Sequence, residues 1–223
     1  MSSSEMLVEI WSDVMCPFCY LGKRRFNDAL EQFAHRADVK VQWRSFQLNP
    51  TLRSDTPISV NEYLAREKGI DARQASQMHE RLTRLGRQAG IVYDFDRAIV
   101  ANSFDAHRLV HFARDYDKED EAVDRLFVAY FTEGRNVGDR QTLVALAKDL
   151  GLDADATTKM LASDDYADAV RSDIREAAQL GIDGVPFFVF DRKYAVSGAQ
   201  EMSVFASVLE QSYAERTRAA STA

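Results

Sequence analysis

The sequence is short of cysteine, of proline, of long apolar runs and of excess basic charge. Its 223 residues include only 2 cysteines and 4 prolines, which excludes a small scaffold held by many disulfides. No apolar run reaches the roughly 18 residues that a transmembrane helix needs, so no membrane span is predicted. The net charge of −7, without a basic stripe interleaved with aromatic residues, indicates that the protein does not bind nucleic acid.

The start of the chain also lacks the features of a secretory signal. The first five residues, 1–5, contain neither a basic segment nor an apolar one, so we expect a cytoplasmic protein. Stable structural disulfides are rare in that compartment. Hydrophobic residues make up 46% of the chain, enough for a large core in one large domain or in one domain with a substantial insertion.

Both cysteines lie in one short segment, Cys16-Pro17-Phe18-Cys19. A strand is predicted over 7–12, and apolar residues recur at helical spacing from Pro17 onward. Cys16 then lies at the helix N-terminus, where the helix dipole and free N–H groups favour a thiolate, and Cys19 follows one turn later. We expect Cys16 to be an accessible nucleophile and Cys19 a buried resolving thiol. A structural disulfide, half of a metal site and two incidental core cysteines are the alternatives.

The remaining pattern predicts an α/β protein with a long helical insertion. A second strand over 39–46 completes a β-α-β unit, which requires a parallel sheet with a right-handed crossover. A hairpin over 187–191 and 194–197 and an amphipathic helix over 202–213 close the fold. Between these parts, helices are predicted over 59–68, 71–88, 103–115, 121–131, 141–150, 153–161 and 166–180.

This pattern divides the chain into three parts. We predict a discontinuous domain of 5–56 and 182–214, a helical subdomain of 57–181, and a disordered tail of 215–223. Within the helices, the basic run 23–25 is expected on a solvated face or beside an acidic ligand. Asp105 is predicted to pair with Arg108, and Glu133 and Arg135 to stabilise a turn.

Two histidines raise the question of a metal. His107 and His111 stand four residues apart on one predicted helix, a spacing that can place both imidazole rings on one face. With the two cysteines they would make a formal four-ligand zinc set. No short loop brings the four together, so we predict no metal site and regard the histidines as structural or partly exposed.

A late segment, Gly184-Val185-Pro186-Phe187-Phe188, opens a strand with a proline, a position where a cis peptide bond can occur. With the CxxC at a strand–helix junction and the helical insertion, it resembles the DsbA-like branch of the thioredoxin superfamily. Four blocks are similar to the cytosolic FrnE-type members of that branch: 13–23, 102–109, 131–135 and 196–200. The resemblance implies an α/β fold, thioredoxin-like, with a large inserted all-helical subdomain.

The resemblance also implies a thiol–disulfide oxidoreductase that exchanges disulfides through a mixed disulfide. Cys16 matches the attacking cysteine and Cys19 the resolving one. Val185 and Pro186 match the cis-proline loop, which in the superfamily packs against the dithiol and offers its backbone to an extended substrate.

Four further residues are expected to bind substrate. Pro17 and Phe18 lie between the cysteines, and Asn102 and His107 belong to one of the four blocks. Phe18 departs from the strong oxidants of the family, which carry histidine there. The implied partners are proteins that carry thiols or disulfides, or glutathione as a co-substrate. No bound cofactor is implied, and the chain is expected to act as a monomer or homodimer.

Two other functions stay open. The 2-hydroxychromene-2-carboxylate isomerases and kappa-class glutathione transferases share the fold, and there a serine usually replaces the first cysteine and activates glutathione. Retention of both cysteines favours disulfide exchange, although Asn49, Asn102 and the Val185 backbone would serve a bound glutathione. The third hypothesis is a peptide-binding, chaperone-like module that uses the helical insertion and needs neither cysteine.

Overall fold

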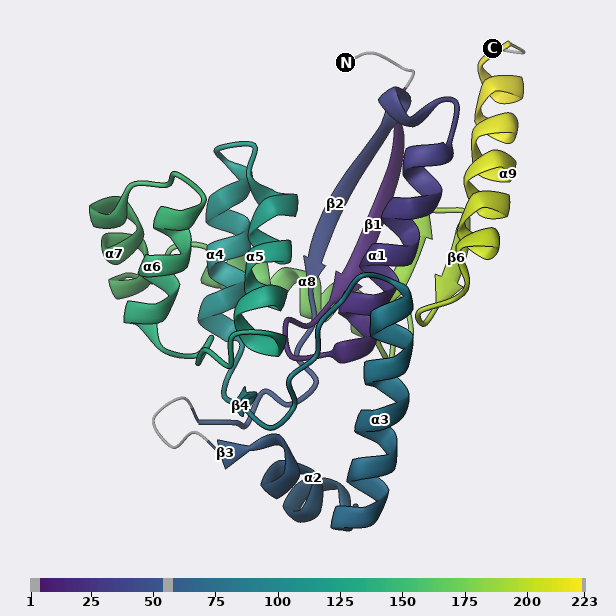
Figure 1. The fold of residues 1–223 in the computed structure, drawn as a ribbon. Coiled ribbons are helices and arrows are strands. Elements are labelled where there is room, and N and C mark those ends of the chain that lie inside the picture. Colours follow the sequence, from purple (N-terminus) through teal and green to yellow (C-terminus); the bar gives the residue numbers. More distant parts are fainter. Residues whose placement is uncertain (1–4, 54–57, 222–223) are drawn as a thin grey trace.

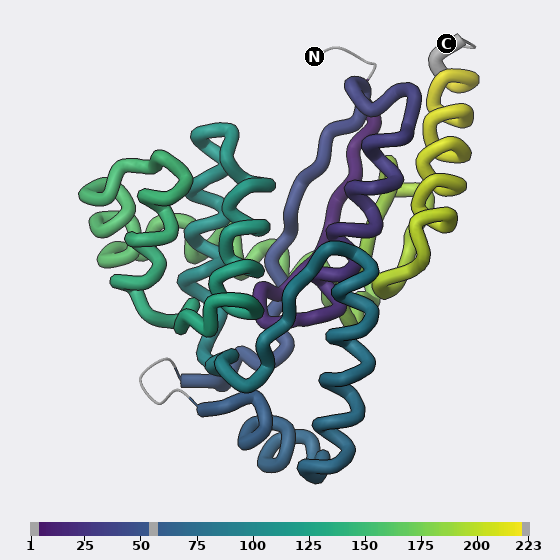
Figure 2. Tube along the Cα trace, viewed as in Figure 1, coloured from purple at the N-terminus to yellow at the C-terminus, as the bar shows by residue number. Residues whose placement is uncertain are grey.

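A four-stranded mixed sheet forms the centre of the computed structural model, which describes residues 5–53 and 58–221 (Figures 1 and 2). The strands β1 Met6–Ser12, β2 Val39–Ser45, β5 Phe187–Phe190 and β6 Tyr194–Ser197 lie in the order β2-β1-β5-β6. β1 runs parallel to β2 and antiparallel to β5, while β5 and β6 form the predicted hairpin. The predicted β-α-β start of the chain is confirmed.

Alternate side chains of β1 enter two different cores. Val8 and Ile10 face helices α1 (Pro17–Gln32) and α9 (Met202–Ser221), whereas Trp11 faces α8 (Ala167–Gln179). Figure 1 shows α1 and α9 on one side of the sheet and α8 on the other. Because side chains alternate along a strand, one strand supplies both layers of an α/β/α arrangement.

The core under α1 and α9 is aromatic. Phe26 of α1 lies with its ring centroid 5.6 Å from that of Phe188, 6.2 Å from Phe190 and 5.8 Å from Phe205. All four rings are fully buried. Edge-on and tilted contacts of this kind add to the free energy gained by removing the rings from water.

The core under α8 contains paired charges. Arg44 of β2 donates to Glu9 Oε1 at 2.5 Å and to Asp173 Oδ1 of α8 at 2.9 Å. Asp173 Oδ2 also accepts the Ser45 amide at 3.0 Å, and the Trp11 indole donates to the Asp173 carbonyl at 3.1 Å. These bonds tie α8 to β1 and to the edge strand β2.

The long middle segment is helical, as predicted, in α2 Val60–Lys68, α3 Ala72–Gln88, α4 Phe104–Arg114, α5 Glu119–Phe131, α6 Arg140–Asp149, α7 Ala154–Ala162 and α8. Ser59 and Asp71 cap α2 and α3 by accepting the amides of Glu62 and Gln74. An unpredicted two-residue ladder pairs β3 (Ile58–Ser59) with β4 (Ile99–Val100), and a single 3-10 turn (Arg36–Asp38) precedes β2. The division into domains stays a prediction, and its boundary at residue 57 lies outside the described residues.

The prediction of a disordered tail is wrong for residues 215–221. α9 continues to Ser221 because its last turns bind the β5–β6 hairpin. Tyr194 donates to Glu215 Oε2 at 2.6 Å, and Arg216 donates to Asp191 Oδ2 at 2.9 Å. A polar sequence thus stays helical because its charges have partners in a distant segment.

The prediction of a solvated basic face is wrong for Lys23. Its side chain is fully buried, with Nζ 2.7 Å from Asp120 Oδ2 and 3.1 Å from Asp124 Oδ2 of α5. A buried ammonium needs such partners because desolvation is costly. The predicted Asp105–Arg108 pair is confirmed at 2.7 Å.

Of the two residues predicted to stabilise the turn after α5, Glu133 makes a close ion pair and Arg135 makes only a long one. Glu133 pairs with Arg125 at 3.0 Å, while Arg135 approaches Glu133 only to 3.9 Å. In residues 5–53 and 58–221, every helix is too short or too polar to cross a lipid bilayer.

Candidate functional site

The two cysteines lie at the connection between β1 and α1 and in the first turn of α1. Cys16 is the N-cap of α1 and Pro17 its first residue, so the proline occupies a position that needs no amide donor. The Cys16 amide donates to the Asp13 carbonyl at 3.0 Å, and the Cys19 amide donates to the Cys16 carbonyl at 3.0 Å. Both cysteines are free thiols in this structure.

The Val185–Pro186 loop packs directly on this turn. Its peptide bond is cis, and the Cys16 thiol donates to the Val185 carbonyl at 3.5 Å. The Pro186 carbonyl accepts the Gly198 amide at 2.8 Å, which connects the loop to the segment after β6. The loop and Cys16, 169 residues apart in sequence, therefore form one site.

Gly22 makes this approach of the loop possible. A Cβ atom on Gly22 would lie 2.9 Å from Pro186 Cγ, closer than side chains normally pack. Gly22 lies within the family block 13–23, and the sequence pattern assigns it no role. The single signal was a glycine inside a predicted helix, which often marks a close backbone approach.

Exposure around the dithiol differs from the prediction at one point. Cys19 is 1% exposed, as expected of a resolving thiol, but Cys16 is only 4% exposed. The prediction that Cys16 is accessible is therefore wrong for this structure, because the Val185 carbonyl lies over its sulfur. Phe18, at 42% exposure, is the part of the motif that faces solvent.

Tyr93, which the sequence reasoning missed, contacts the motif from the link after α3. Its hydroxyl donates to the Pro17 carbonyl at 2.6 Å, and its ring meets Tyr20 edge-on at 5.9 Å. Burial raises the pKa of Tyr93, and the nearby Cys16 raises it further, so the hydroxyl stays protonated. Only the fold brings this link to the dithiol.

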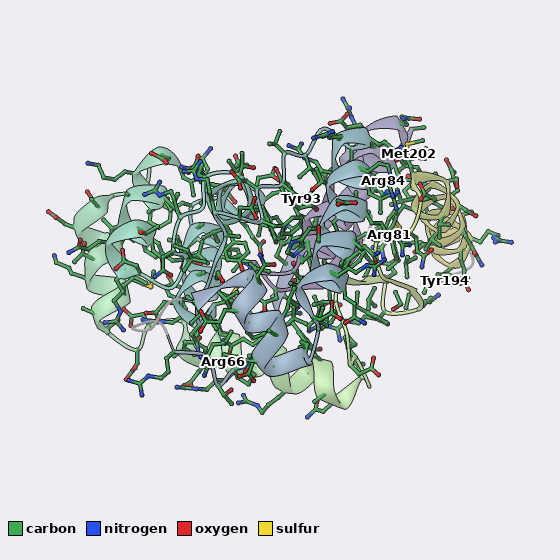
Figure 3. The ribbon with its side chains drawn as sticks, turned by 60° about the horizontal axis from the view of Figure 1, so that its bottom comes forward. Arg66, Arg81, Arg84, Tyr93, Tyr194 and Met202 are labelled. Atoms are coloured by element: carbon green, nitrogen blue, oxygen red, sulfur yellow. The ribbon has the colours of Figure 1, made fainter. Side chains whose placement is uncertain are left out.

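A groove of about 730 Å³ begins at Tyr93 and follows α3. Figure 3 views this side of the molecule, with Tyr93 labelled on one side of α3 and Arg81 and Arg84 on the other. Arg84 and Arg87 line the groove, and so do the carboxylates of Asp94 and Asp96. The groove thus carries side chains of both charge signs.

Behind the dithiol lies a buried carboxylate. Asp13 is fully buried; its Oδ1 accepts the Met15 amide at 3.3 Å and its Oδ2 accepts the Leu48 amide at 2.8 Å. His107 Nε2 lies 3.6 Å from Asp13 Oδ1. Predicted as a substrate contact, His107 is only 4% exposed and lies on the inner side of the site.

The two thiols have different surroundings. Burial raises the pKa of Cys19 well above its ordinary value, and the neighbouring Cys16 raises it further. The Ser12 side chain and the Asp13 backbone oppose this shift. Cys19 therefore keeps its proton in the reduced protein until a reaction removes it.

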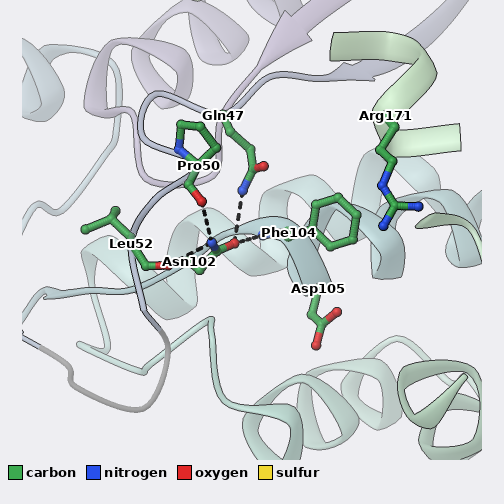
Figure 4. Close-up of a pocket in the computed structure, with 7 residues that line it drawn as sticks. All are labelled: Gln47, Pro50, Leu52, Asn102, Phe104, Asp105 and Arg171. Atoms are coloured by element: carbon green, nitrogen blue, oxygen red, sulfur yellow. Dashed lines mark hydrogen bonds between the residues drawn. The ribbon is translucent and has the colours of Figure 1, made fainter. Parts of the chain in front are cut away.

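Asn102 is committed to the loop after β2. Its Nδ2 donates to the carbonyls of Pro50 and Leu52 at 3.1 and 2.8 Å, and its Oδ1 accepts from Gln47 and from the Phe104 amide (Figure 4). These residues line a surface pocket of about 400 Å³. The predicted role of Asn102 in substrate binding stays a prediction, as does that of Asn49, whose Oδ1 accepts from Thr51.

His111 is also buried, and it bonds to polar side chains away from the thiols. Its Nε2 lies 2.9 Å from Asp173 Oδ2 and 3.2 Å from Ser45 Oγ. Across the described ranges, 5–53 and 58–221, no cluster of three or more His, Cys, Asp or Glu side chains is arranged to hold a metal. The geometry of the site therefore rests on a dithiol, a cis-proline loop and a buried carboxylate.

The family model of the DsbA-like thioredoxin domain matches residues 7–210. The chain belongs to this family. As a DsbA-like protein it is 42% identical to a probable DsbA oxidoreductase of Streptomyces coelicolor, with a TM-score of 0.91 over 95% of this chain and 91% of that one. It is also 29% identical over 200 residues to the uncharacterised Bacillus subtilis protein YwbO, across 89% of this chain and 92% of YwbO.

More distant structures are similar to this DsbA-like chain in fold alone. A 2-hydroxychromene-2-carboxylate isomerase matches with a TM-score of 0.68 at 16% identity, over 92% of this chain and 95% of its own. The cytosolic disulfide reductase DsbM of Pseudomonas aeruginosa, with glutathione, matches with a TM-score of 0.64 at 17% identity, over 92% and 98%. The expected thioredoxin-like fold with a helical insertion is confirmed.

Proposed function

We propose that this DsbA-like protein is a thiol–disulfide oxidoreductase whose dithiol is Cys16 and Cys19. One observation carries the proposal: a cysteine at a helix N-terminus lies 3.5 Å from the Val185 carbonyl of a cis-proline loop, with a second, buried cysteine one turn behind it. The partners are proteins with thiols or disulfides. Because the fold is shared with the cytosolic disulfide reductase DsbM, we propose that the protein works in the cytoplasm.

The reaction follows from these positions. The Cys16 thiolate attacks a substrate disulfide, forms a mixed disulfide and expels one substrate thiolate. Cys19 then attacks Cys16, so a Cys16–Cys19 disulfide forms while the second substrate thiolate leaves. Two electrons pass from the dithiol to the substrate, and the reverse sequence oxidises a substrate dithiol.

The substrate binds against the loop and the exposed edge of the motif. Cys16 must become accessible for attack, so we propose that the substrate backbone displaces the thiol from the Val185 carbonyl and pairs with that loop. Phe18 and the Pro17 ring flank the incoming sulfur. The groove that starts at Tyr93 binds the part of the substrate polypeptide that lies beyond its disulfide.

The test is reduction of insulin by three proteins: wild type, Cys16→Ser and Cys19→Ser. We expect Cys16→Ser to lose activity to background and Cys19→Ser to accumulate a mixed disulfide on Cys16, detected as a mass increase that dithiothreitol removes. Matching thermal unfolding midpoints exclude unfolding as the cause. Full activity of Cys16→Ser would refute the proposal.

The direction of electron flow follows from the reduction potential of the pair. A potential near about −120 mV would identify an oxidant, and one near about −270 mV a reductant. Equilibration in glutathione buffers of graded ratio, acid quenching and mass spectrometry of the trapped thiols measure it. The absence of histidine at position 18 leads us to expect a value below that of the strong oxidants.

Glutathione is the second candidate partner, favoured by the fold shared with DsbM, which is described with glutathione, and with the isomerase. In the same buffers, a stable glutathione adduct on Cys16 without any intramolecular disulfide would favour glutathione-dependent chemistry. A chaperone function of the helical segment would survive replacement of both cysteines in an aggregation assay.

A further inference from the structure

A small cavity lies behind the dithiol, where the ends of β1 and β2 meet α4, and polar and apolar side chains line it together. Its volume is about 10 Å³, room for one water molecule. The polar side chains that line it are Ser12, Arg44, Ser45 and His107. A cavity of this size stays filled only where polar groups can bond to the water, and this lining provides them.

His107 lines this space, and one of its ring nitrogens has no direct hydrogen-bond partner among the described residues. Its side chain is 5% exposed, and within the described part of the chain Nε2 makes no hydrogen bond. Asp13 Oδ1, at 3.6 Å, is near enough to attract a proton on the ring but too far for a hydrogen bond. An unpaired buried polar atom is costly, so a bridging water is the natural occupant.

His111, one turn later on the same helix, shows what a structural histidine looks like here. Its Nε2 is within hydrogen-bond distance of both Asp173 Oδ2, at 2.9 Å, and Ser45 Oγ, at 3.2 Å. The two histidines share a helix and a degree of burial. They differ in that the His107 nitrogen has no hydrogen-bond partner among the described residues.

Cys19 needs a proton acceptor that is inside the protein. Its side chain is 1% exposed, so bulk water does not reach the sulfur. Burial raises the pKa of Cys19, and the adjacent Ser12 side chain lowers it. Ser12 is thus in reach of the thiol on one side and lines the cavity with His107 on the other.

We propose that His107, with the Asp13 carboxylate beside it, accepts the proton of Cys19 through the Ser12 hydroxyl and one water in the cavity. This role rests on the proposed disulfide exchange and concerns its second step alone. His107 does not touch the substrate; it controls how readily Cys19 becomes the attacking thiolate.

Resolution of the mixed disulfide moves one proton and exchanges one sulfur–sulfur bond for another. The Cys19 proton passes to the hydroxyl and water chain, and the same chain delivers a proton to His107 Nε2. The Cys19 thiolate attacks Cys16 Sγ of the mixed disulfide, the new sulfur–sulfur bond forms, and the substrate leaves as a thiolate with the electron pair. The imidazolium is stabilised by the Asp13 carboxylate and returns its proton to water later.

Several charged groups surround this ring. Asp13 from the β1–α1 turn faces Nε2, Arg44 from β2 lines the cavity, and Tyr130 from α5 lies close enough to Asp13 to interact with it. The His111–Asp173 pair lies beyond Ser45. The carboxylates of Glu9 and Asp173 are already paired with Arg44. Asp13 is therefore the carboxylate that can act on His107.

The experiment separates the two steps with Ellman's disulfide as the probe. Reduced protein releases a first thionitrobenzoate when Cys16 attacks and a second when Cys19 resolves the adduct. In stopped flow at pH 7, we expect His107→Gln to slow the second release on the order of 10²-fold and to change the first less than about 2-fold. The pH profile of the second rate should differ from that of wild type in this variant.

Two further variants complete the test. His111→Gln, the matched control, should keep the wild-type second release and its pH profile. Ser12→Ala removes the relay hydroxyl without altering either histidine and should also slow the second release, which keeps the test valid if His107→Gln does not fold.

The outcomes distinguish the two proposals. A second release as fast in His107→Gln or Ser12→Ala as in wild type, with an unchanged pH profile, overturns the proton transfer. Equal slowing by His111→Gln overturns it too, because the effect would then be structural. If wild type gives no second release at all, the disulfide exchange itself is refuted.

Discussion

The two faces of the central sheet are built from the same strands by different physics. Toward α1 and α9, Phe26, Phe188, Phe190 and Phe205 pack ring against ring with no buried charge among them. Toward α8, Arg44 bonds to Glu9 and Asp173 across the strands. The first face is stabilised by burial of apolar area, and this contribution to the free energy does not depend on the direction of the contacts. The second depends on a few directional bonds.

This difference has a consequence for the site. Apolar contacts set the positions of α1 and α9 without directional bonds, but the Asp173 bonds to Arg44 and Ser45 hold α8 in one position. The Val185–Pro186 loop follows α8 and must meet Cys16. We infer that the charged face sets the position of the loop, whereas the aromatic face supplies most of the stability.

The largest effect is expected where the aromatic face is broken. Phe26→Ala removes the ring that contacts the other three, and we expect it to lower the free energy of unfolding by about 4 kcal/mol. Urea unfolding followed by circular dichroism measures the change. Val204→Ala, at a position 38% exposed on α9, is the control and should cost less than about 1 kcal/mol.

A smaller but pH-dependent effect is expected on the charged face. Burial alone would raise the pKa of Asp173, but bonds from His111 and the Ser45 amide, with the charge of Arg44, hold it below its ordinary value. Asp173→Asn leaves Arg44 and His111 with a weaker partner and should lower the free energy of unfolding by about 3 kcal/mol at pH 7.

The sign of the pH dependence checks that cause. Because the folded pKa is lowered, the unfolded chain takes up the proton first as pH falls. The stabilisation from Asp173 is thus complete above about pH 4, the ordinary range of aspartate, and is lost below it. The difference between wild type and Asp173→Asn should shrink between about pH 4 and pH 2. A constant difference would contradict this account.

The smallest effect is expected at the rim of the same face. Arg192 pairs with Glu9 and Glu176, but its side chain is 45% exposed, and Glu9 keeps Arg44 as a partner without it. We expect Arg192→Met to change the free energy of unfolding by less than about 1 kcal/mol and to lose even that in 1 M salt. A change as large as that of Asp173→Asn would show that the two faces differ less than we infer.

Local patterns accounted for most of the secondary structure. The alternation of β1, the caps Ser59 and Asp71 and the helical periodicity of 59–181 all act over a few residues, so they can be read in order along the chain. The prediction of disorder after 214 failed because Glu215 and Arg216 find their partners, Tyr194 and Asp191, in another segment.

Local sequence patterns predicted only part of the candidate site. The spacing of Cys16 and Cys19 and the proline of the late loop are local features. Tyr93 and Gly22 were missed because each acts through a contact with a distant segment: Tyr93 with Pro17, and Gly22 with Pro186. Burial of Lys23 and Cys16 likewise depends on which segment covers them.

By itself, the sequence determined where a strand turns into a helix and that two cysteines one turn apart stand at that junction. Those properties follow from backbone propensity and periodicity, which neighbouring residues decide. The tertiary structure alone decided that Val185 covers Cys16 and that His107 lies against Asp13 behind it. Such contacts join segments about a hundred residues or more apart, and their free energy depends on the packing of the whole chain.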